Sequence, residues 1–252
     1  MKVSVCLAVL LSMAMYSLEG NAMDDRLYEL RTYHANPGKL DALHARFRDH
    51  TVKLFEKHGM TNIGYWVPRD NKDNVLIYVL AFPNETARDQ SWKDFLADED
   101  WKAAYSASTK DGKLIGRIDS VLMQATDYSP PIKVSASDAD RLFELRTYTT
   151  HPGKLDGLNA RFRDHTTALF TKHGLPQFAY WTPTKVDDGR DNKLIYILAV
   201  KDEATRQAGF DAFRDDADWK AARDASEANG PLLIKGGVES VLLVPTDYSP
   251  TK

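Results

Sequence analysis

The segment YELRTYHANPGKLDALHARFRDHTVKLFEKHG, from Tyr28 to Gly59, returns as FELRTYTTHPGKLDGLNARFRDHTTALFTKHG, from Phe143 to Gly174. Later motifs repeat in the same order, and both copies close on TDYSP, beginning at Thr126 and at Thr246. Each copy of roughly 110 residues is longer than a solenoid unit and has the usual size of a domain. The sequence therefore predicts a duplicated domain.

The two copies occupy residues 23–130 and 141–252. Residues 131–140, PIKVSASDAD, lie between them and have the proline, serine and small residues of a linker. We therefore expect two domains of similar structure joined by a short connection.

Residues 1–22 have the pattern of a secretory signal peptide. Lys2 supplies a positive charge, the stretch from Val3 to Tyr16 is mostly apolar, and Gly20-Asn-Ala22 resembles a cleavage site. The apolar stretch is shorter than the ~20 residues that a membrane span needs. We therefore expect a periplasmic or secreted bacterial protein with no stable membrane span after cleavage.

Composition narrows the classes of function. The single cysteine, Cys6, lies in the predicted signal peptide, so the mature chain has no thiol for a disulfide, a nucleophile or a metal site. The chain is 43% hydrophobic and 27% charged with a net charge of −3, which indicates a globular protein without the basic surface typical of nucleic-acid binding. No metal-ligand spacing, phosphate loop or nucleophile elbow is present, and we predict no metal and no cofactor.

Each copy has the pattern β-α-β-β-α-β, which is typical of the ferredoxin-like fold within the α+β class. Strands favour β-branched and aromatic residues, and a helix often begins at a proline or after an asparagine cap. In the first copy the expected strands are Leu27–His34, Thr61–Val67, Val75–Phe82 and Leu114–Gln124, with helices after Pro37-Gly38 and after Asn84.

Side chains alternate across the first strand, so it has two different faces. Glu29, Arg31 and Tyr33 share one face, and Glu144, Arg146 and Tyr148 are their equivalents. We expect the opposite, apolar face to pack on the helices. The polar face also carries either Tyr65 or Trp66, depending on the register, and is too aromatic to be left in water.

Two such faces in one chain can cover each other. The two sheets would then pack face to face into an eight-stranded, barrel-like core, lined partly by glutamate and arginine. Buried charges need partners. We expect Glu29–Arg31 and Glu144–Arg146 pairs, or pairs between the copies.

The run Glu-Leu-Arg-Thr-Tyr, the following Pro-Gly-Lys-Leu, the Tyr-Trp-x-Pro strand and an arginine of the second helix (Arg88, Arg206) resemble the NIPSNAP family. The resemblance extends over Leu27–Tyr128 and Leu142–Tyr248. It implies ferredoxin-like units whose sheets pair into a dimeric α+β barrel. It implies no particular reaction, because the biochemical role of the family is poorly defined.

Several repeated side chains are candidates for a ligand site. The glutamate–arginine pairs could bind a small polar ligand or be structural, and the tyrosines could donate to a ligand or be satisfied locally. The histidines lie at the edge of the apolar stripe of the first helix and could serve as acid–base groups, as haem ligands or as structural residues. The candidates are Glu29, Arg31, Tyr33, His50, Trp66, Glu144, Arg146, Tyr148, His165 and Trp181.

Two classes of function remain open. The first is a protein that binds or transforms a small organic molecule in a cavity of the barrel without a tightly defined cofactor. The second is a non-catalytic binding or scaffold module of the cell envelope. Further homo-oligomerisation also stays open.

Overall fold

The structure is a computed structural model and describes residues 24–135 and 141–252. The predicted signal peptide and part of the predicted linker lie outside the described residues. The first repeat contains β1 (Leu27–Ala35), α1 (Leu40–Arg46), the π-helical turn η1 (Phe47–Thr51), α2 (Val52–Lys57), β2 (Thr61–Pro68), β3 (Val75–Phe82), α3 (Glu85–Ala97), α4 (Glu99–Ser108) and β4 (Ile115–Ala125).

The second repeat follows the same order with one short insertion. It contains β5 (Leu142–Thr150), α5 (Leu155–Arg161), the π-helical turn η2 (Phe162–Thr166), α6 (Thr167–Lys172), β6 (Gln177–Pro183), the 3-10 turn η3 (Val186–Asp188), β7 (Lys193–Val200), α7 (Glu203–Asp215), α8 (Ala217–Ser226) and β8 (Leu233–Pro245). The predicted α+β class and the predicted strand–helix order are confirmed.

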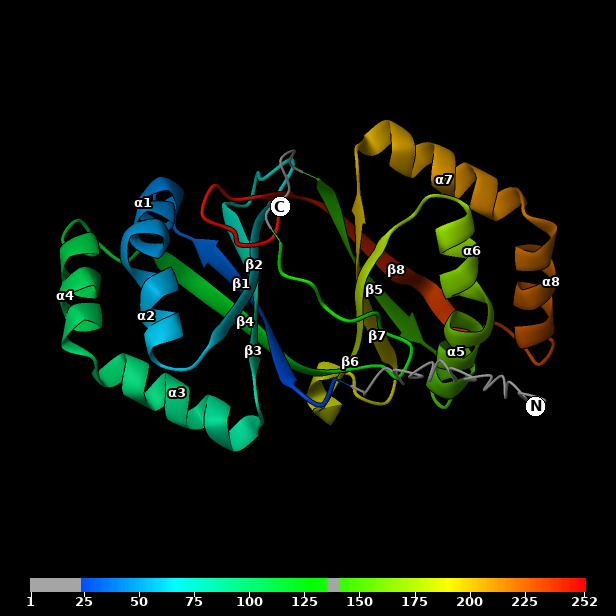
Figure 1. The fold of residues 1–252 in the computed structure, drawn as a ribbon, viewed down its shortest axis with the longest axis horizontal. Coiled ribbons are helices and arrows are strands. Elements are labelled where there is room, and N and C mark those ends of the chain that lie inside the picture. The colour runs from blue at the N-terminus through cyan, green and yellow to red at the C-terminus, as the bar shows by residue number, and fades with distance from the viewer. Residues whose placement is uncertain (1–23, 136–140) are drawn as a thin grey trace, which may run out of the picture.

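The eight strands form one closed antiparallel barrel in the order β1-β3-β2-β8-β5-β7-β6-β4. Strands β2 and β8 pair across one seam between the repeats, where Trp66 lies opposite Pro245. Strands β4 and β6 pair across the other seam, where Ala125 lies opposite Trp181. Closure leaves neither half with a free sheet edge, and it confirms the predicted intramolecular barrel. The helices of each repeat cover the outer side of its half of the barrel (Figure 1).

The two faces of β1 are reversed relative to the sequence prediction. Tyr28 and Leu30 point into the barrel, whereas Glu29 and Arg31 point outward to the helices. The barrel interior is apolar, not lined by glutamate and arginine, because the charged side chains find partners on the helices. Its buried members from both repeats are Tyr28, Leu30, Ile63, Trp66, Val75, Ile77, Val79, Ala81, Met123, Phe143, Phe178, Ala179, Trp181, Ile195, Ile197, Ala199 and Leu243.

Each first helix contains a π-helical turn that shifts its phase. The backbone N–H of Val52 bonds the carbonyl of Phe47, five residues back, and the hydroxyl of Thr51 donates to the carbonyl of Arg46 at 3.1 Å. Thr166 and Arg161 repeat that bond at 3.1 Å in the second repeat. The wider turn rotates the residues within it around the helix axis. Its side chains therefore no longer follow the apolar stripe that regular three- and four-residue spacing predicts.

The TDYSP segment at the end of each repeat crosses to the other repeat. Tyr248 packs on Phe47, with ring centroids 6.2 Å apart, and Tyr128 packs on Phe162 at 6.4 Å. The hydroxyl of Ser249 accepts the backbone N–H of Tyr65 at 2.9 Å. These exchanged tails tie the halves together in addition to the two strand seams.

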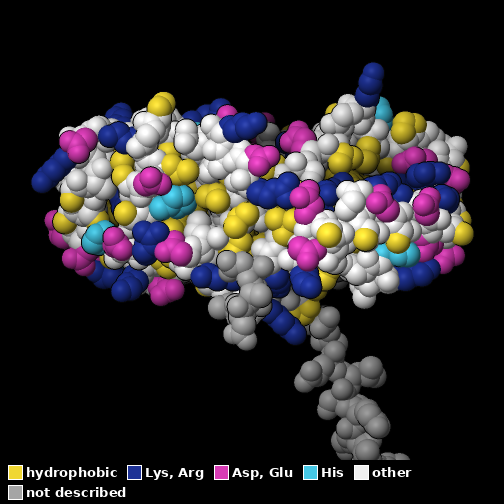
Figure 2. All heavy atoms as spheres, turned by 90° about the horizontal axis from the view of Figure 1, so that it is seen from above, with side chains coloured by type: hydrophobic (Ala, Val, Ile, Leu, Met, Phe, Trp, Pro, Cys, Tyr) yellow, Lys and Arg dark blue, Asp and Glu magenta, His cyan; other side chains and the backbone are white. Residues whose placement is uncertain are grey.

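The surface carries both signs of charge. Basic and acidic side chains are interspersed over the face shown in Figure 2, which accords with the small net charge of −3. Among the described residues, no helix is long and apolar enough to span a membrane.

Candidate functional site

A buried carboxylate on β1 organises the space between the sheet and the helices of the first repeat. Glu29 has no exposed surface. It accepts hydrogen bonds from Arg31 at 2.5 Å, from the indole N–H of Trp92 at 2.9 Å and from the hydroxyl of Ser120 at 2.7 Å. Arg88 of α3 adds two more, at 2.8 and 2.9 Å, in the forked geometry that makes arginine–carboxylate pairs strong. The carboxylate therefore fixes the position of two guanidinium groups.

The same cluster recurs in the second repeat with one bond fewer. Glu144 accepts from Arg146 at 2.5 Å, twice from Arg206 at 2.6 Å, and from Ser240 at 2.5 Å. Phe210 takes the place of Trp92 and has no N–H to donate. The predicted Glu29–Arg31 and Glu144–Arg146 pairs both form.

These contacts hold both carboxylates in the charged form. Burial alone would raise the pKa of Glu29, but the bonds from Arg88 and Ser120 and the charge of Arg31 outweigh it and lower the pKa to about 2. The pKa of Glu144 is also lowered, since Arg206 and Arg146 outweigh the effect of its burial.

The depressed pKa of Glu29 predicts a loss of stability in acid. A carboxylate whose pKa falls from 4.5 to about 2 on folding stabilises the protein above pH 4.5, and the contribution disappears as the pH falls towards 2. We expect the free energy of unfolding of wild type to exceed that of Glu29→Gln by on the order of 3 kcal/mol at pH 5, and the gap to shrink towards pH 2. Urea melts at pH 5, 3 and 2 measure this gap. A difference in stability that stays constant from pH 5 to pH 2 would contradict the lowered pKa of Glu29.

A cavity lies beside each charge cluster, between the sheet and the helices. The first-repeat cavity has a volume of about 400 Å³ and the second-repeat cavity about 320 Å³. Both are lined by the arginine and tyrosine that follow the buried glutamate on the first strand. The first-repeat cavity is bounded by Arg31, Tyr33, Arg46, Phe47, Thr51, Phe55, Arg88, Trp92, Phe95, Leu96, Trp101, Tyr105, Ile115 and Ile118.

The guanidinium groups in the first-repeat cavity lie against aromatic rings. Arg31 lies 4.4 Å from the ring centroid of Trp92, a distance at which the ring attracts the cation. Burial opposes the charge of Arg31, but Tyr78, Tyr33 and Glu29 outweigh it, and its pKa is raised. The cavity thus combines fixed positive charge with aromatic walls.

The structure does not bring all the predicted site residues together. Arg31 and Tyr33 line the first-repeat cavity, and Arg146 and Tyr148 line the second. Glu29 and Glu144 lie behind them as anchors. The candidate residues also included His50 and His165, and neither histidine lines either cavity.

The two histidines are exposed on the outside of the helices. His50 lies in a groove between the first helical segment and α4 with Asp49, Lys53 and Asp100, away from Arg31. His165 occupies the equivalent exposed position. The π-helical turns cause the difference, because they rotate these side chains past the edge of the apolar stripe.

The two tryptophans lie in the barrel interior. Trp66 packs on Phe143 of the other repeat at 5.4 Å between ring centroids, and Trp181 packs on Tyr28 at 5.6 Å. Both are fully buried. They connect the halves and contribute nothing to either cavity.

Two cavity residues, Arg46 and Arg161, were not among the predicted candidates. They follow Leu43 and Leu158 by three residues and directly precede Phe47 and Phe162, so they flank the apolar stripe in both copies. A cation repeated beside an apolar stripe was the available signal. Arg88 and Arg206 were noted only as part of the family resemblance, not as partners of the glutamates.

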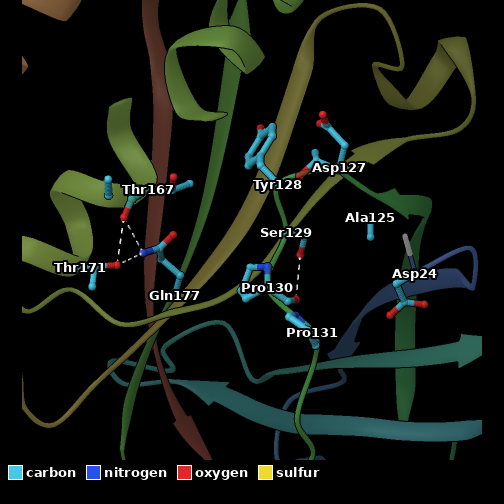
Figure 3. A pocket seen from close by; sticks show the side chains of 12 residues that line it. Asp24, Ala125, Asp127, Tyr128, Ser129, Pro130, Pro131, Thr167, Thr171 and Gln177 are labelled. Atoms are coloured by element: carbon cyan, nitrogen blue, oxygen red, sulfur yellow. Dashed lines mark hydrogen bonds between the residues drawn. The ribbon is translucent and has the colours of Figure 1, made fainter. Parts of the chain in front are cut away.

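A further hollow of about 730 Å³ lies where the crossing TDYSP segment meets α6 (Figure 3). Its polar groups are largely engaged in local bonds. Gln177 donates to the carbonyl of Thr167 at 2.8 Å and to the hydroxyl of Thr171 at 2.9 Å, and Ser129 accepts the N–H of Tyr180 at 3.0 Å. We assign it to the interface between the repeats, since the described residues that line it include no cation. The described residues contain no group of three or more side chains arranged to hold a metal ion.

Comparisons with solved structures give the same fold. A monooxygenase-like protein from Lactobacillus acidophilus aligns over 90% of this chain and 95% of its own, with a TM-score of 0.54 and 11% identity. An anthrone oxidase-like protein aligns over 91% of this chain and 95% of its own, with a TM-score of 0.55 and 12% identity. At these identities the likeness concerns the fold alone.

Sequence comparison gives the family. A curated relative, the NipSnap homolog of Dictyostelium discoideum, is 27% identical over 143 residues, which cover 56% of this chain and 56% of the relative. The chain thus spans about half the length of the curated relative it matches. The family model NIPSNAP matches residues 28–130 and again residues 143–250. The chain belongs to the NIPSNAP family, with two tandem NIPSNAP units that close one barrel.

Proposed function

We propose that this protein binds a small organic molecule in the cavities between its helices and its barrel. One observation carries the proposal: a cavity of about 400 Å³ has aromatic walls and a guanidinium, that of Arg31, held in place by a buried carboxylate. Binding sites for small molecules commonly have volumes of about 300–1,000 Å³, apolar walls and a few fixed polar groups. Because the charge cluster holds Arg31 rigidly, a ligand would not have to order it.

The mouths of the cavities allow a direct test. Ile118 and Leu96 line the first-repeat cavity and are 45% and 58% exposed, and Arg214 lines the second-repeat cavity with an exposed side chain. Tryptophan at Ile118 and at Arg214 would cover both openings without removing a buried contact.

We expect neutral and charged bicyclic aromatic fragments to bind wild type in saturation-transfer NMR. In the double variant Ile118→Trp/Arg214→Trp, affinity should fall about tenfold or more, which corresponds to a loss of about 1.4 kcal/mol. Val186→Trp, at an exposed turn outside both cavities, is the matched control and should bind as wild type does. Equal binding by the double variant would place the site elsewhere. Failure of every fragment to bind wild type would favour the alternative of a non-catalytic envelope scaffold.

We also propose that the protein is exported. The charged start, the apolar stretch and the Gly20-Asn-Ala22 motif support this proposal. Protein recovered from the envelope of a bacterial host should begin at Met23 when its N-terminus is sequenced. Intact Met1 on protein confined to the cytoplasm would contradict export.

A further inference from the structure

The two cavities differ at one buried cation. Arg46 is only 4% exposed and lines the first-repeat cavity. Its guanidinium makes one hydrogen bond, to the hydroxyl of Ser108 at 3.3 Å, and lies 5.2 Å from the ring centroid of Trp101. Its Nε is buried without a partner among the described residues, as is that of Arg161 in the second repeat. Unlike Arg161, Arg46 forms no ion pair with any residue in the ranges 24–135 and 141–252.

The counterpart in the second repeat is neutralised. Arg161 donates to Glu227 at 3.0 Å and to Ser226 at 3.2 Å, and it lies 5.1 Å from the ring centroid of Trp219. Glu227 directly follows the last residue of α8, and the equivalent position after α4 is Thr109. A single difference in residue type therefore decides whether the buried guanidinium has a counter-ion.

The residues at the cavity openings also differ in charge between the two repeats. Leu96 and Tyr105 line the first-repeat cavity where Arg214 and Arg223 line the second. These two arginines pair with aspartates on their own helices. The first-repeat cavity is thus aromatic and apolar around an uncompensated cation, while the charges of the second are largely matched.

A buried charge without a partner is costly, and a bound anion removes that cost. Arginine stays protonated in proteins, and its planar fork matches a carboxylate with two parallel bonds. The rings of Phe47, Trp92 and Trp101 provide walls suited to an aromatic body.

We propose that the first-repeat cavity binds an aromatic carboxylate whose charged group pairs with Arg46, and that Glu227 prevents the second-repeat cavity from doing so. The proposal rests on the proposed function and names the ligand class of one of its two cavities. One anion is expected per chain, despite two repeats of the same fold.

The test compares 2-naphthoate with its neutral analogue 2-naphthamide, by isothermal titration calorimetry on the full chain. We expect one naphthoate per wild-type chain, bound about tenfold or more tightly than the amide, because a desolvated charge pair contributes strongly to affinity. Thr109→Glu copies the second repeat. It should weaken naphthoate about tenfold or more and leave the amide nearly unchanged. Thr109→Gln adds the same bulk without charge and should retain naphthoate binding.

The reciprocal variant gives a gain of binding. Glu227→Thr frees Arg161 and should add a second naphthoate site per chain, and naphthoate should raise the melting temperature of this variant. Equal affinities for acid and amide, or no effect of Thr109→Glu on naphthoate, would overturn the proposal while leaving the proposed function standing. Binding of neither compound by a protein that binds other fragments would also overturn it. Binding of no fragment at all would defeat both.

Discussion

Replacing Glu29 with alanine is expected to lower the free energy of unfolding by about 3–5 kcal/mol, the usual cost of leaving a buried charge without its partner. Glu29 has no exposed surface and receives five hydrogen bonds, two of them from Arg88. Its loss leaves Arg31, whose side chain is 13% exposed, beside apolar surface. For a domain of this size the melting temperature should drop by roughly 6–20 °C.

Two controls separate the buried cluster from ordinary ion pairs. Asp119→Ala breaks an exposed contact with His34 and should cost less than about 1 kcal/mol. In Glu29→Ala/Arg31→Met the orphaned charge of Arg31 is removed, so the double variant should recover part of the loss. Thermal and urea denaturation measure the stability of these three variants. A Glu29→Ala protein as stable as the Asp119→Ala protein would show that the cluster is not structural.

The second large effect is expected in the barrel interior, where the repeats meet. Trp66 is fully buried and packs on Phe143 and on Phe178 of the other repeat, at 5.4 and 6.3 Å between ring centroids. Trp66→Ala should cost about 3–5 kcal/mol, since it removes a large apolar side chain and leaves a cavity. Because Trp66 and Phe143 pack in the same barrel interior, their contributions to the free energy of unfolding should be coupled.

A double-mutant cycle tests that coupling across the repeats. Trp66→Ala and Phe143→Ala together should differ from the sum of the single effects by about 0.5–3 kcal/mol. Leu96→Ala, at a 58% exposed position, is the control. Its effect on the free energy of unfolding should add to that of Trp66→Ala without coupling. Strict additivity of Trp66→Ala and Phe143→Ala, or two separate unfolding transitions in wild type, would mean that the halves do not share one core.

The sequence predicted the fold well because its evidence was local and repeated. Strand alternation, the Asn84 cap, whose side chain accepts the N–H of Ala87 at 2.9 Å, and the duplication all act over short distances along the chain. The barrel was predicted because the chain contains two sheets, each with one face not covered by its own helices. The resemblance to the NIPSNAP family agreed with this result and is confirmed.

The orientation of β1 could not be predicted in the same way. Alternation separates Tyr28 from Glu29 but does not say which of them faces the barrel. That choice depends on Arg88 and Trp92, which lie 59 and 63 residues after Glu29 and supply its partners. A polar face can be buried against helices that carry its counter-ions, so polarity alone gave the wrong orientation.

The candidate site was predicted in part for a similar reason. Arg31, Tyr33 and their equivalents lie in the cavities as strand residues of regular geometry. His50 does not, because the π-helical turn at Phe47–Thr51 breaks the period from which its direction was inferred. No residue type in that turn indicates that the helix contains an extra residue there. Arg46 was not predicted to line a cavity, because a cation beside an apolar stripe usually extends to water.

The position of bound 2-naphthoate decides whether Arg46 is the anion-binding group of the first-repeat cavity. Crystals of the full chain soaked with the compound should show its ring between β1 and the helices α3 and α4, with its carboxylate within hydrogen-bonding distance of Arg46. The second-repeat cavity should remain without it. Density in the second-repeat cavity at equal occupancy, or only in the hollow beside the TDYSP segment of the first repeat, would show that Arg46 does not select the carboxylate.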